Sequence, residues 1–192
     1  LLEALAPMGI HAFLQAGTSS EYGRNAAGPN ENTPTTPNSH YAVSKSAATQ
    51  LLYYMAKEHA VPCINLRIYS AYGPFEDSSR LIPQVVIQGK KGELPEFVRP
   101  EISRDFIYVE DVVEAFIKSA NSLTPQHYGH SFNIGTGICT TVKDLATIAQ
   151  TQFNIKQSPA YVMQERNWDV TDWYADPTNA LKAFDWKASV DL

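Results

Sequence analysis

The sequence predicts an α/β protein built on a parallel sheet, and two observations support that prediction. Residues 11–17 and 61–69 are mostly apolar without polar alternation, as strands covered on both faces are. Between them, residues 38–59 have the length and apolar spacing of a helix. A strand, a helix and a second strand in this order form a parallel crossover, because the helix returns the chain to the same sheet edge.

The remaining elements follow the same logic in chain order. Residues 1–8 are expected to end a helix at Gly9, and residues 21–37, rich in Gly, Asn, Pro and Thr, are expected to form a surface loop. Further expected strands are short and further expected helices are amphipathic. These strands are 94–98, 131–137 and possibly 160–163, and the helices are 80–89, 112–120, 142–153 and 177–184.

Composition and charge exclude several functional classes. The chain is 44% hydrophobic and 18% charged, as folded proteins are, and its net charge of −5 argues against nucleic acid as a partner. No apolar run approaches the roughly 20 residues of a membrane span, and no signal-peptide layout opens the chain, so we expect no membrane partner. Cys63 and Cys139 lie far apart, which favours a reducing, cytoplasmic location. His127 and His130 have no further ligand at suitable spacing; we expect them to be solvated and predict no metal site.

The most informative motif is Tyr41-Ala42-Val43-Ser44-Lys45 at the start of the expected helix. Residues four apart share a helix face, so the phenol and the ammonium should lie close together. A neighbouring cation favours the phenolate, which lets a group with an ordinary pKa of about 10 exchange protons near neutral pH. Tyr53 and Lys57 repeat the spacing, but Tyr53 should point about 120° away and pack. The alternative for Tyr41 is a half-buried helix tyrosine beside a solvated lysine.

A hydroxyl cluster, Thr18-Ser19-Ser20, ends the first expected strand. All three side chains are candidates for contacting a substrate, and Thr18 could hydrogen-bond the oxygen on which Tyr41 acts. The alternative for Thr18 is a hydroxyl that satisfies the local backbone.

Gly135-Thr136-Gly137 invites a dinucleotide interpretation, because glycine-rich turns bind pyrophosphate on their amides. Thr140 stands where the fingerprint G-x-G-x-x-G requires its third glycine. A helix-capping turn is therefore the better prediction, and no other stretch of the chain carries the fingerprint.

Seven motifs in one order resemble the extended short-chain dehydrogenase/reductase family, in particular its nucleotide-sugar epimerases, dehydratases and reductases. The resemblance spans nearly the whole chain and implies a Rossmann-like sheet whose glycine-fingerprint half lies outside these residues. The matching pieces are Gly17 to Gly23, Tyr41-x-x-x-Lys45, Leu66 to Pro74, Arg80 to Pro83, Arg104 to Asp111, Phe132 to Gly135 and Asp176 to Thr178.

The resemblance assigns roles to the catalytic side of the site. Tyr41 would be the acid or base on the sugar hydroxyl, and Lys45 would lower the pKa of Tyr41 and hold the nicotinamide ribose. Thr18 would hydrogen-bond the reacting oxygen. Tyr69 and Ser70 would lie against an NAD or NADP cofactor.

The resemblance also places the nucleotide-diphosphate sugar in a second lobe. Arg104 would reach the diphosphate, Arg166 could add a second contact, and Leu81 and Ile82 would border the base. The alternative for Arg104 is a surface ion pair with an adjacent carboxylate, which contributes less than about 1 kcal/mol. Asp111 and Asp176 are expected to be structural, the first as a helix cap.

The domain organisation implied is a C-terminal part of a Rossmann-like domain over residues 1–75 and a mostly substrate-binding lobe over 76–192. A crossover at about 105–140 would return to the sheet. A homodimer through the Tyr41–Lys45 helix, using Leu51 and Tyr54, is also implied.

The function that follows is NAD(P)-dependent epimerisation or ketosugar reduction on a nucleotide sugar. Dehydratases of the family place an Asp-Glu pair, or at least a glutamate, where this chain has Ser19 and Ser20. Glu21 comes one residue late, and on a strand one residue reverses the facing direction. A 4,6-dehydratase is therefore the less favoured alternative. A truncated module that binds a nucleotide sugar or a protein without catalysis is another.

Overall fold

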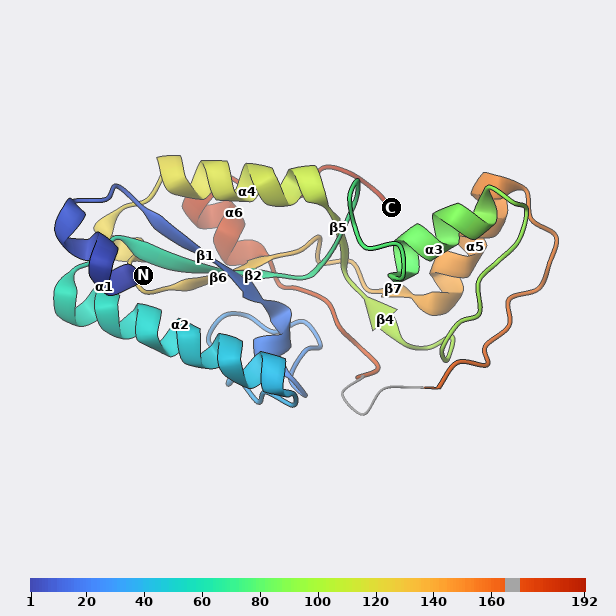
Figure 1. Cartoon of the computed structure of the whole chain (residues 1–192), viewed down its shortest axis with the longest axis horizontal. Coiled ribbons are helices and arrows are strands. Elements are labelled where there is room, and N and C mark those ends of the chain that lie inside the picture. The colour runs from blue at the N-terminus through green and yellow to red at the C-terminus, as the bar shows by residue number, and fades with distance from the viewer. Residues whose placement is uncertain (165–169) are drawn as a thin grey trace.

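A three-stranded parallel sheet forms the larger part of the protein. The computed structural model describes residues 1–164 and 170–192. Strands β1 (Phe13–Thr18), β2 (Cys63–Ile68) and β6 (Ser131–Ile134) lie in the order β1-β2-β6, with β2 in the centre (Figure 1). Both strand pairs are parallel. The predicted α/β class and Rossmann-like parallel sheet are confirmed.

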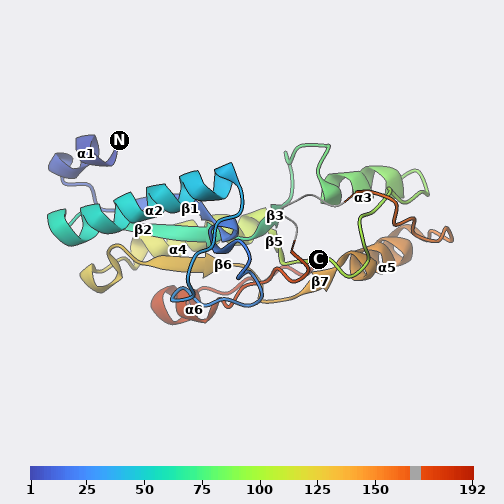
Figure 2. The same cartoon turned by 90° about the horizontal axis from the view of Figure 1, so that it is seen from below.

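Helices cover both faces of this sheet, giving three layers (Figure 2). Helix α2 (His40–His59) packs on β1 and β2 from one side, and the short α1 (Leu2–Leu5) lies against it. Helices α4 (Val109–Asn121) and α6 (Thr178–Phe184) pack together on the opposite face. Helices on both faces account for strands that are mostly apolar. Ala16 of β1 stays exposed, and β2 also buries the polar Asn65 and Arg67.

Helix α2 begins and ends where its capping residues place it. The Ser39 side chain accepts a hydrogen bond from the Ala42 amide at 3.1 Å, and Ala60 ends the helix in the left-handed conformation. Ser44 lies outside the buried face of the helix: its side chain is exposed and donates a hydrogen bond to the Tyr41 carbonyl. The buried face consists of Ala42, Thr49, Leu52, Met55 and Ala56.

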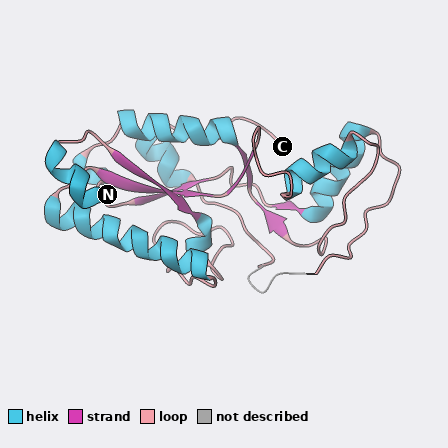
Figure 3. Ribbon diagram, viewed as in Figure 1, coloured by secondary structure: helices cyan, strands magenta, loops and turns pink. Residues whose placement is uncertain are grey.

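A smaller lobe lies at the other end of the molecule (Figure 3). Helices α3 (Leu81–Gly89) and α5 (Val142–Phe153) pack together there, beside the antiparallel pair β4 (Ser103–Arg104) and β7 (Thr140–Thr141). The parallel pair β3 (Ser70–Tyr72) and β5 (Phe106–Tyr108) connects β2 to α4. Two predicted strands, 94–98 and 160–163, form only a single bridge between Phe97 and Tyr161.

The hydroxyl cluster after β1 is not extended. Residues Ser19–Tyr22 form a 3-10 helix, η2, because Thr18 and Glu21 make a reciprocal capping box. Two further 3-10 helices are η1 (Ala6–Met8), which stops at the left-handed Gly9, and η3 (Pro125–His127). Within the described residues, no helix is both long enough and apolar enough to cross a membrane.

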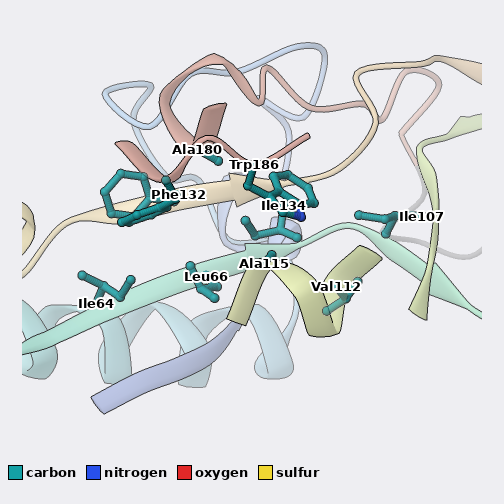
Figure 4. Close-up of a cluster of buried hydrophobic side chains, with 10 residues drawn as sticks. Ile64, Leu66, Ile107, Val112, Ala115, Phe132, Ile134, Ala180 and Trp186 are labelled. Atoms are coloured by element: carbon teal, nitrogen blue, oxygen red, sulfur yellow. The ribbon is translucent and has the colours of Figure 1, made fainter. Parts of the chain in front are cut away.

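The main hydrophobic core lies between the sheet and the α4–α6 layer (Figure 4). Ile64 and Leu66 of β2 and Ile134 of β6 are fully buried, and Trp186 after α6 closes over them. A second cluster joins α3 to α5, and a third lies under α2.

Replacing Ile64 by Ala should lower the free energy of unfolding by about 2–5 kcal/mol, because a fully buried side chain leaves a cavity. Urea unfolding followed by circular dichroism measures the change. The control is Ile117→Ala on α4, where the side chain is 56% exposed and the change should stay within about 0.5 kcal/mol. Equal losses in the two variants would contradict the assignment of the core.

Candidate active site

The first turn of α2 presents Tyr41 and Lys45 together. The Tyr41 side chain is 54% exposed, and Lys45 Nζ lies 5.8 Å from the centroid of its ring. The same ammonium donates a hydrogen bond to the Ala16 carbonyl of β1 at 2.9 Å. Lys45 therefore links the start of the helix to the end of the strand, and both side chains keep an exposed position.

Tyr53 and Lys57 reproduce the pair geometry but not its surroundings. Lys57 Nζ lies 5.7 Å from the Tyr53 ring, and the ammonium donates to the Tyr128 carbonyl. Tyr53 is 52% exposed, so the prediction that it packs in the interior is wrong. The difference between the two pairs is that Tyr41 and Lys45 lie on the helix end nearer η2, which packs against α2.

Thr18 and Ser19 lie at the junction of β1 and η2. Thr18 Oγ1 accepts a hydrogen bond from the Ser20 amide at 3.2 Å, which is the local backbone role that the sequence left open. A hydroxyl that accepts one bond still has its own proton to donate. Ser19 is buried and its Oγ accepts from Trp173 Nε1 at 2.9 Å, whereas Ser20 is half-buried.

Glu21 is fully buried below this turn. The direction of its side chain was predicted on the assumption that it lies on a strand, and that assumption is wrong. The residue lies in a 3-10 helix rather than on a strand. Its Oε1 accepts from the Thr18 amide at 3.3 Å, and its Oε2 accepts from Arg67 Nε at 3.1 Å. Asn65 Nδ2 and Thr49 Oγ1 donate to the same carboxylate. The carboxylate is therefore fully engaged by protein groups.

Arg67 of β2 joins Glu21 to the neighbouring Tyr22. Its guanidinium donates to Tyr22 Oη at 2.9 Å and lies 4.5 Å from the Tyr22 ring. Burial lowers the pKa of Arg67, but the interactions with Tyr22 and Glu21 raise it by more than burial lowers it. The net shift of the pKa is upward, so the side chain stays charged. Burial raises the pKa of Tyr22, although Arg67 opposes this, so its hydroxyl stays protonated and donates to Asn133 Oδ1 at 2.8 Å.

Arg104 lies in the small lobe against Trp173. Its guanidinium carbon is 5.1 Å from the Trp173 ring, and Nη1 donates to the Ser103 carbonyl at 2.7 Å. Trp173 also reaches Ser19, so the residue expected at the diphosphate connects to the Thr18 turn through one indole. Arg166 lies outside the described residues.

The glycine turn at 135–137 is not a helix cap, and its amides do not face a phosphate. The Asp105 carboxylate accepts hydrogen bonds from the Thr136 amide, the Thr136 hydroxyl and the Gly137 amide. The amide of Ala175 completes the set. Asp105 thus fastens the turn to β5, and α5 begins only after Thr141, its own N-cap.

The other residues expected at the cofactor and the base have mixed positions. Tyr69 is buried with Trp173 in a small apolar cluster, burial raises the pKa of its phenol, and its hydroxyl has no hydrogen-bond partner. Ser70 is half-buried and its amide donates to the Asp105 carbonyl. Leu81 and Ile82 are partly buried against the α3–α5 core.

Three structural expectations need correction or refinement. Asp111 does not cap α4, because its carboxylate accepts from the Ser189 amide and hydroxyl and from the Val190 amide. Asp176 is structural and accepts from the Thr178 amide. His127 is buried edge-on to aromatic rings rather than solvated.

No three His, Cys, Asp or Glu residues of residues 1–164 and 170–192 could together hold a metal ion.

The loop after η2 crosses to the outer edge of β6. Glu31 Oε1 accepts from the Asn133 amide at 2.7 Å, and Oε2 accepts from Asn179 Nδ2 at 2.5 Å. Asn133 Nδ2 in turn donates to the Pro29 carbonyl. The predicted surface loop is therefore fastened to both β6 and α6.

The sequence reasoning missed the polar cluster under Thr18, although a signal was present. Asn65 and Arg67 interrupt an otherwise apolar central strand. A buried charge needs a partner, so their presence in such a strand already implied a buried carboxylate elsewhere in the chain. Glu21 is that carboxylate.

The nicotinamide end of an NAD site fits the exposed donors of Tyr41 and Lys45, since a phenol and an ammonium can bond ribose hydroxyls. The orphaned Tyr69 hydroxyl is a further unmatched polar atom. The glycine fingerprint for the pyrophosphate is absent from the 192 residues.

A parallel three-layer fold with Tyr-x-x-x-Lys at a helix start defines the short-chain dehydrogenase/reductase class. The model of the NAD dependent epimerase/dehydratase family matches residues 1–135. The chain belongs to this family.

The similar proteins act on nucleotide sugars. CDP-abequose synthase of Salmonella typhimurium is 26% identical over 155 residues, which are 79% of this chain and 52% of that protein. UDP-glucose 4-epimerase of Mycolicibacterium smegmatis is 26% identical over 200 residues, covering 100% of this chain and 62% of that one. The chain thus spans about half to three-fifths of the length of these two relatives.

Solved structures of proteins bound to nucleotide sugars have the same fold as this chain. The Thermotoga maritima UDP-glucose 4-epimerase with UDP-glucose superposes with a TM-score of 0.89 at 28% identity, over 100% of this chain and 62% of that one. MoeE5 in complex with UDP-glucose and NAD superposes with a TM-score of 0.88 at 27% identity, over 100% and 64%.

Glu31 should give the protein a pH-dependent contribution to stability. Burial raises the pKa of its carboxyl above 4.5, so the folded state binds a proton more readily than the unfolded state. The stabilisation is complete below the unfolded pKa and is lost as the pH rises through the folded one. As the pH falls from 7 to 4.5, the unfolding free energy of the wild type should therefore rise relative to that of Glu31→Gln.

Urea unfolding of both proteins across this pH range measures the difference. Glu58→Gln at the exposed end of α2 is the control, and the difference between it and the wild type should stay flat. A flat difference for Glu31→Gln as well would contradict the burial of this carboxyl.

Proposed function

We propose that the protein takes part in NAD(P)-dependent epimerisation or reduction of a nucleotide-diphosphate sugar at a sugar carbon bearing a hydroxyl or keto group. The observation that carries the proposal is the exposed Tyr41 with the Lys45 ammonium at 5.8 Å, tied to the strand that ends at Thr18. Membership of the family and the nucleotide sugars named for its relatives support the substrate class.

In this proposal each residue has a separate task. Tyr41 exchanges the proton of the sugar hydroxyl, and Lys45 holds the nicotinamide ribose. Thr18 donates a hydrogen bond to the same sugar oxygen. A nicotinamide cofactor held by Tyr41 and Lys45 would supply the hydride chemistry at that carbon.

Substrate binding in this proposal uses the small lobe. Arg104 binds the diphosphate, because a planar guanidinium can give two hydrogen bonds to phosphate oxygens. The stacking of Arg104 on Trp173 would fix the plane of the guanidinium. Leu81 and Ile82 border the base.

Elimination of water is the less favoured reaction. A 4,6-dehydratase needs a carboxyl group at the sugar, and this chain has Ser19 and Ser20 at the expected positions. The nearby Glu21 is fully buried and bonded to four protein groups, so it does not offer that carboxyl.

A second candidate function is binding of a nucleotide sugar without turnover. The specific observation in its favour is that the residues proposed for the diphosphate and the base, Arg104, Leu81 and Ile82, all lie in the small lobe. Calorimetric titration with NAD and NADP, and separately with UDP-, dTDP-, CDP- and GDP-sugars, distinguishes the two candidates. Binding of a sugar nucleotide without either dinucleotide would favour this second function for the chain by itself.

Replacing Tyr41 by Phe should lower turnover by about 10²- to 10⁴-fold, because an acid–base group is lost, while the Kd for the nucleotide sugar stays within about threefold. Steady-state kinetics with NAD and calorimetry measure the two quantities. Tyr53→Phe is the matched control, since it removes the same hydroxyl from the same type of lysine pair. Equal turnover in Tyr41→Phe and wild type would remove Tyr41 from the chemistry.

We further propose a homodimer through α2. The helix exposes an apolar stripe of Val43, Leu51 and Tyr54, each at least half exposed. Leu51→Asp should shift the protein toward monomer in sedimentation velocity at micromolar concentration, whereas Ile117→Asp on α4 should not. A monomeric wild type would contradict the proposal.

A further inference from the structure

The buried carboxylate of Glu21 connects three elements that carry the proposed site. Through Oε1 it holds the amide of Thr18, the last residue of β1 and the N-cap of η2, at 3.3 Å. Through Oε2 it holds Thr49 Oγ1 in α2 at 3.0 Å and Arg67 Nε in β2 at 3.1 Å. The side chain is fully buried, so water does not compete for these bonds.

The link to α2 is made one turn beyond Lys45. Thr49 Oγ1 lies 3.1 Å from the Lys45 carbonyl as well as 3.0 Å from the Glu21 carboxylate. Since Lys45 Nζ is bonded to the Ala16 carbonyl, the helix is tied to the strand-end region at two points, one of them through Glu21.

Close packing makes this arrangement specific. A Cβ atom at Gly17 would lie 2.1 Å from Asn65 Oδ1, so only glycine next to Thr18 leaves room for Asn65, which donates to Glu21 Oε1. The Arg67 guanidinium is also buried and pairs with the carboxylate. A charged acceptor roughly doubles the strength of a hydrogen bond, so the Thr18 amide is held more firmly than by a neutral cap.

We propose that Glu21 is a positioning residue, which sets the place of Thr18 relative to the Tyr41–Lys45 helix without touching the substrate. The inference deepens the proposed function and rests on it for its kinetic consequence. Its structural consequence can be measured without any cofactor.

The first experiment is amide hydrogen exchange by NMR on the ¹⁵N-labelled chain. The Thr18 amide of Glu21→Gln should exchange at least tenfold faster than that of the wild type, with each rate normalised to the Leu66 amide in the core strand. Normalisation removes any uniform loss of stability. Glu31→Gln is the matched control, because it also removes a carboxylate, here partly buried, that accepts a backbone amide, and it should leave the Thr18 ratio within twofold.

The second experiment uses a variant that keeps the buried ion pair. Removing one partner of such a pair is strongly destabilising, which makes Glu21→Gln prone to unfolding. Thr49→Val cuts the link from Glu21 to α2, together with the contacts of the same hydroxyl to Gln15 Nε2 and the Lys45 carbonyl, and leaves the Glu21–Arg67 pair in place. With a nucleotide sugar and NAD, it should lower kcat at least tenfold and leave KM within threefold. Thr147→Val is the control, because Thr147 bonds the Lys143 carbonyl in α5 in the same way but contacts no carboxylate.

The two experiments separate this proposal from the proposed function. An unchanged Thr18 exchange ratio in folded Glu21→Gln, or an unchanged kcat in Thr49→Val of an active protein, overturns the positioning role. A wild type without turnover but with faster Thr18 exchange in Glu21→Gln supports the positioning role and counts against the proposed function. If Glu21→Gln does not fold, the kcat of Thr49→Val decides.

Discussion

The buried ion pair between Glu21 and Arg67 is the interaction on which the rest of this structure depends. Both side chains are removed from water, which is unfavourable unless each charge is matched and hydrogen-bonded. Their partners come from β1, η2, α2 and β2, and Tyr22 extends the set to Asn133 in β6. A network of this kind is satisfied in only one arrangement of the elements. It therefore fixes how the strand ends meet helix α2, whereas the apolar core on the other face fixes only that the layers close.

The small lobe is connected to the Glu21–Arg67 region through Trp173. Trp173 bonds to Ser19 on one side and stacks with Arg104 on the other, so the residue proposed for the diphosphate is held against the turn that carries Thr18. Asp105, the neighbour of Arg104, is occupied with the 135–137 turn and with Ala175. The lobe and the sheet are thus connected by directional bonds rather than by apolar contact alone.

The two Tyr–Lys pairs of α2 differ in their surroundings rather than in their internal geometry. Tyr41–Lys45 and Tyr53–Lys57 have nearly the same internal geometry, 5.8 and 5.7 Å from ammonium to ring. Helix periodicity produces both, because it depends only on spacing. The first pair lies at the start of α2, beside the strand-end hydroxyls. The second pair lies near the end of α2, beside the 128–129 turn, where Lys57 donates a hydrogen bond to the Tyr128 carbonyl. The chemistry of the pair is therefore decided by its neighbours.

The sequence by itself determined the fold class, most helix bounds and the family, because these depend on local periodicity, caps and motif order. Helix α5 begins and ends where its Thr141 cap and apolar spacing predict. Only the tertiary structure decided where Glu21 points, that His127 is buried, and that Asp105 holds the glycine turn. Each of these depends on a partner far away in sequence, such as Phe184 for His127, 57 residues apart, and Arg67 for Glu21, 46 residues apart, or on a 3-10 turn that local alternation did not reveal. Polar contacts across such separations leave no periodic pattern in the sequence. Asn65 and Arg67 in an apolar strand therefore showed that a buried polar partner must exist, but they did not show which residue it is.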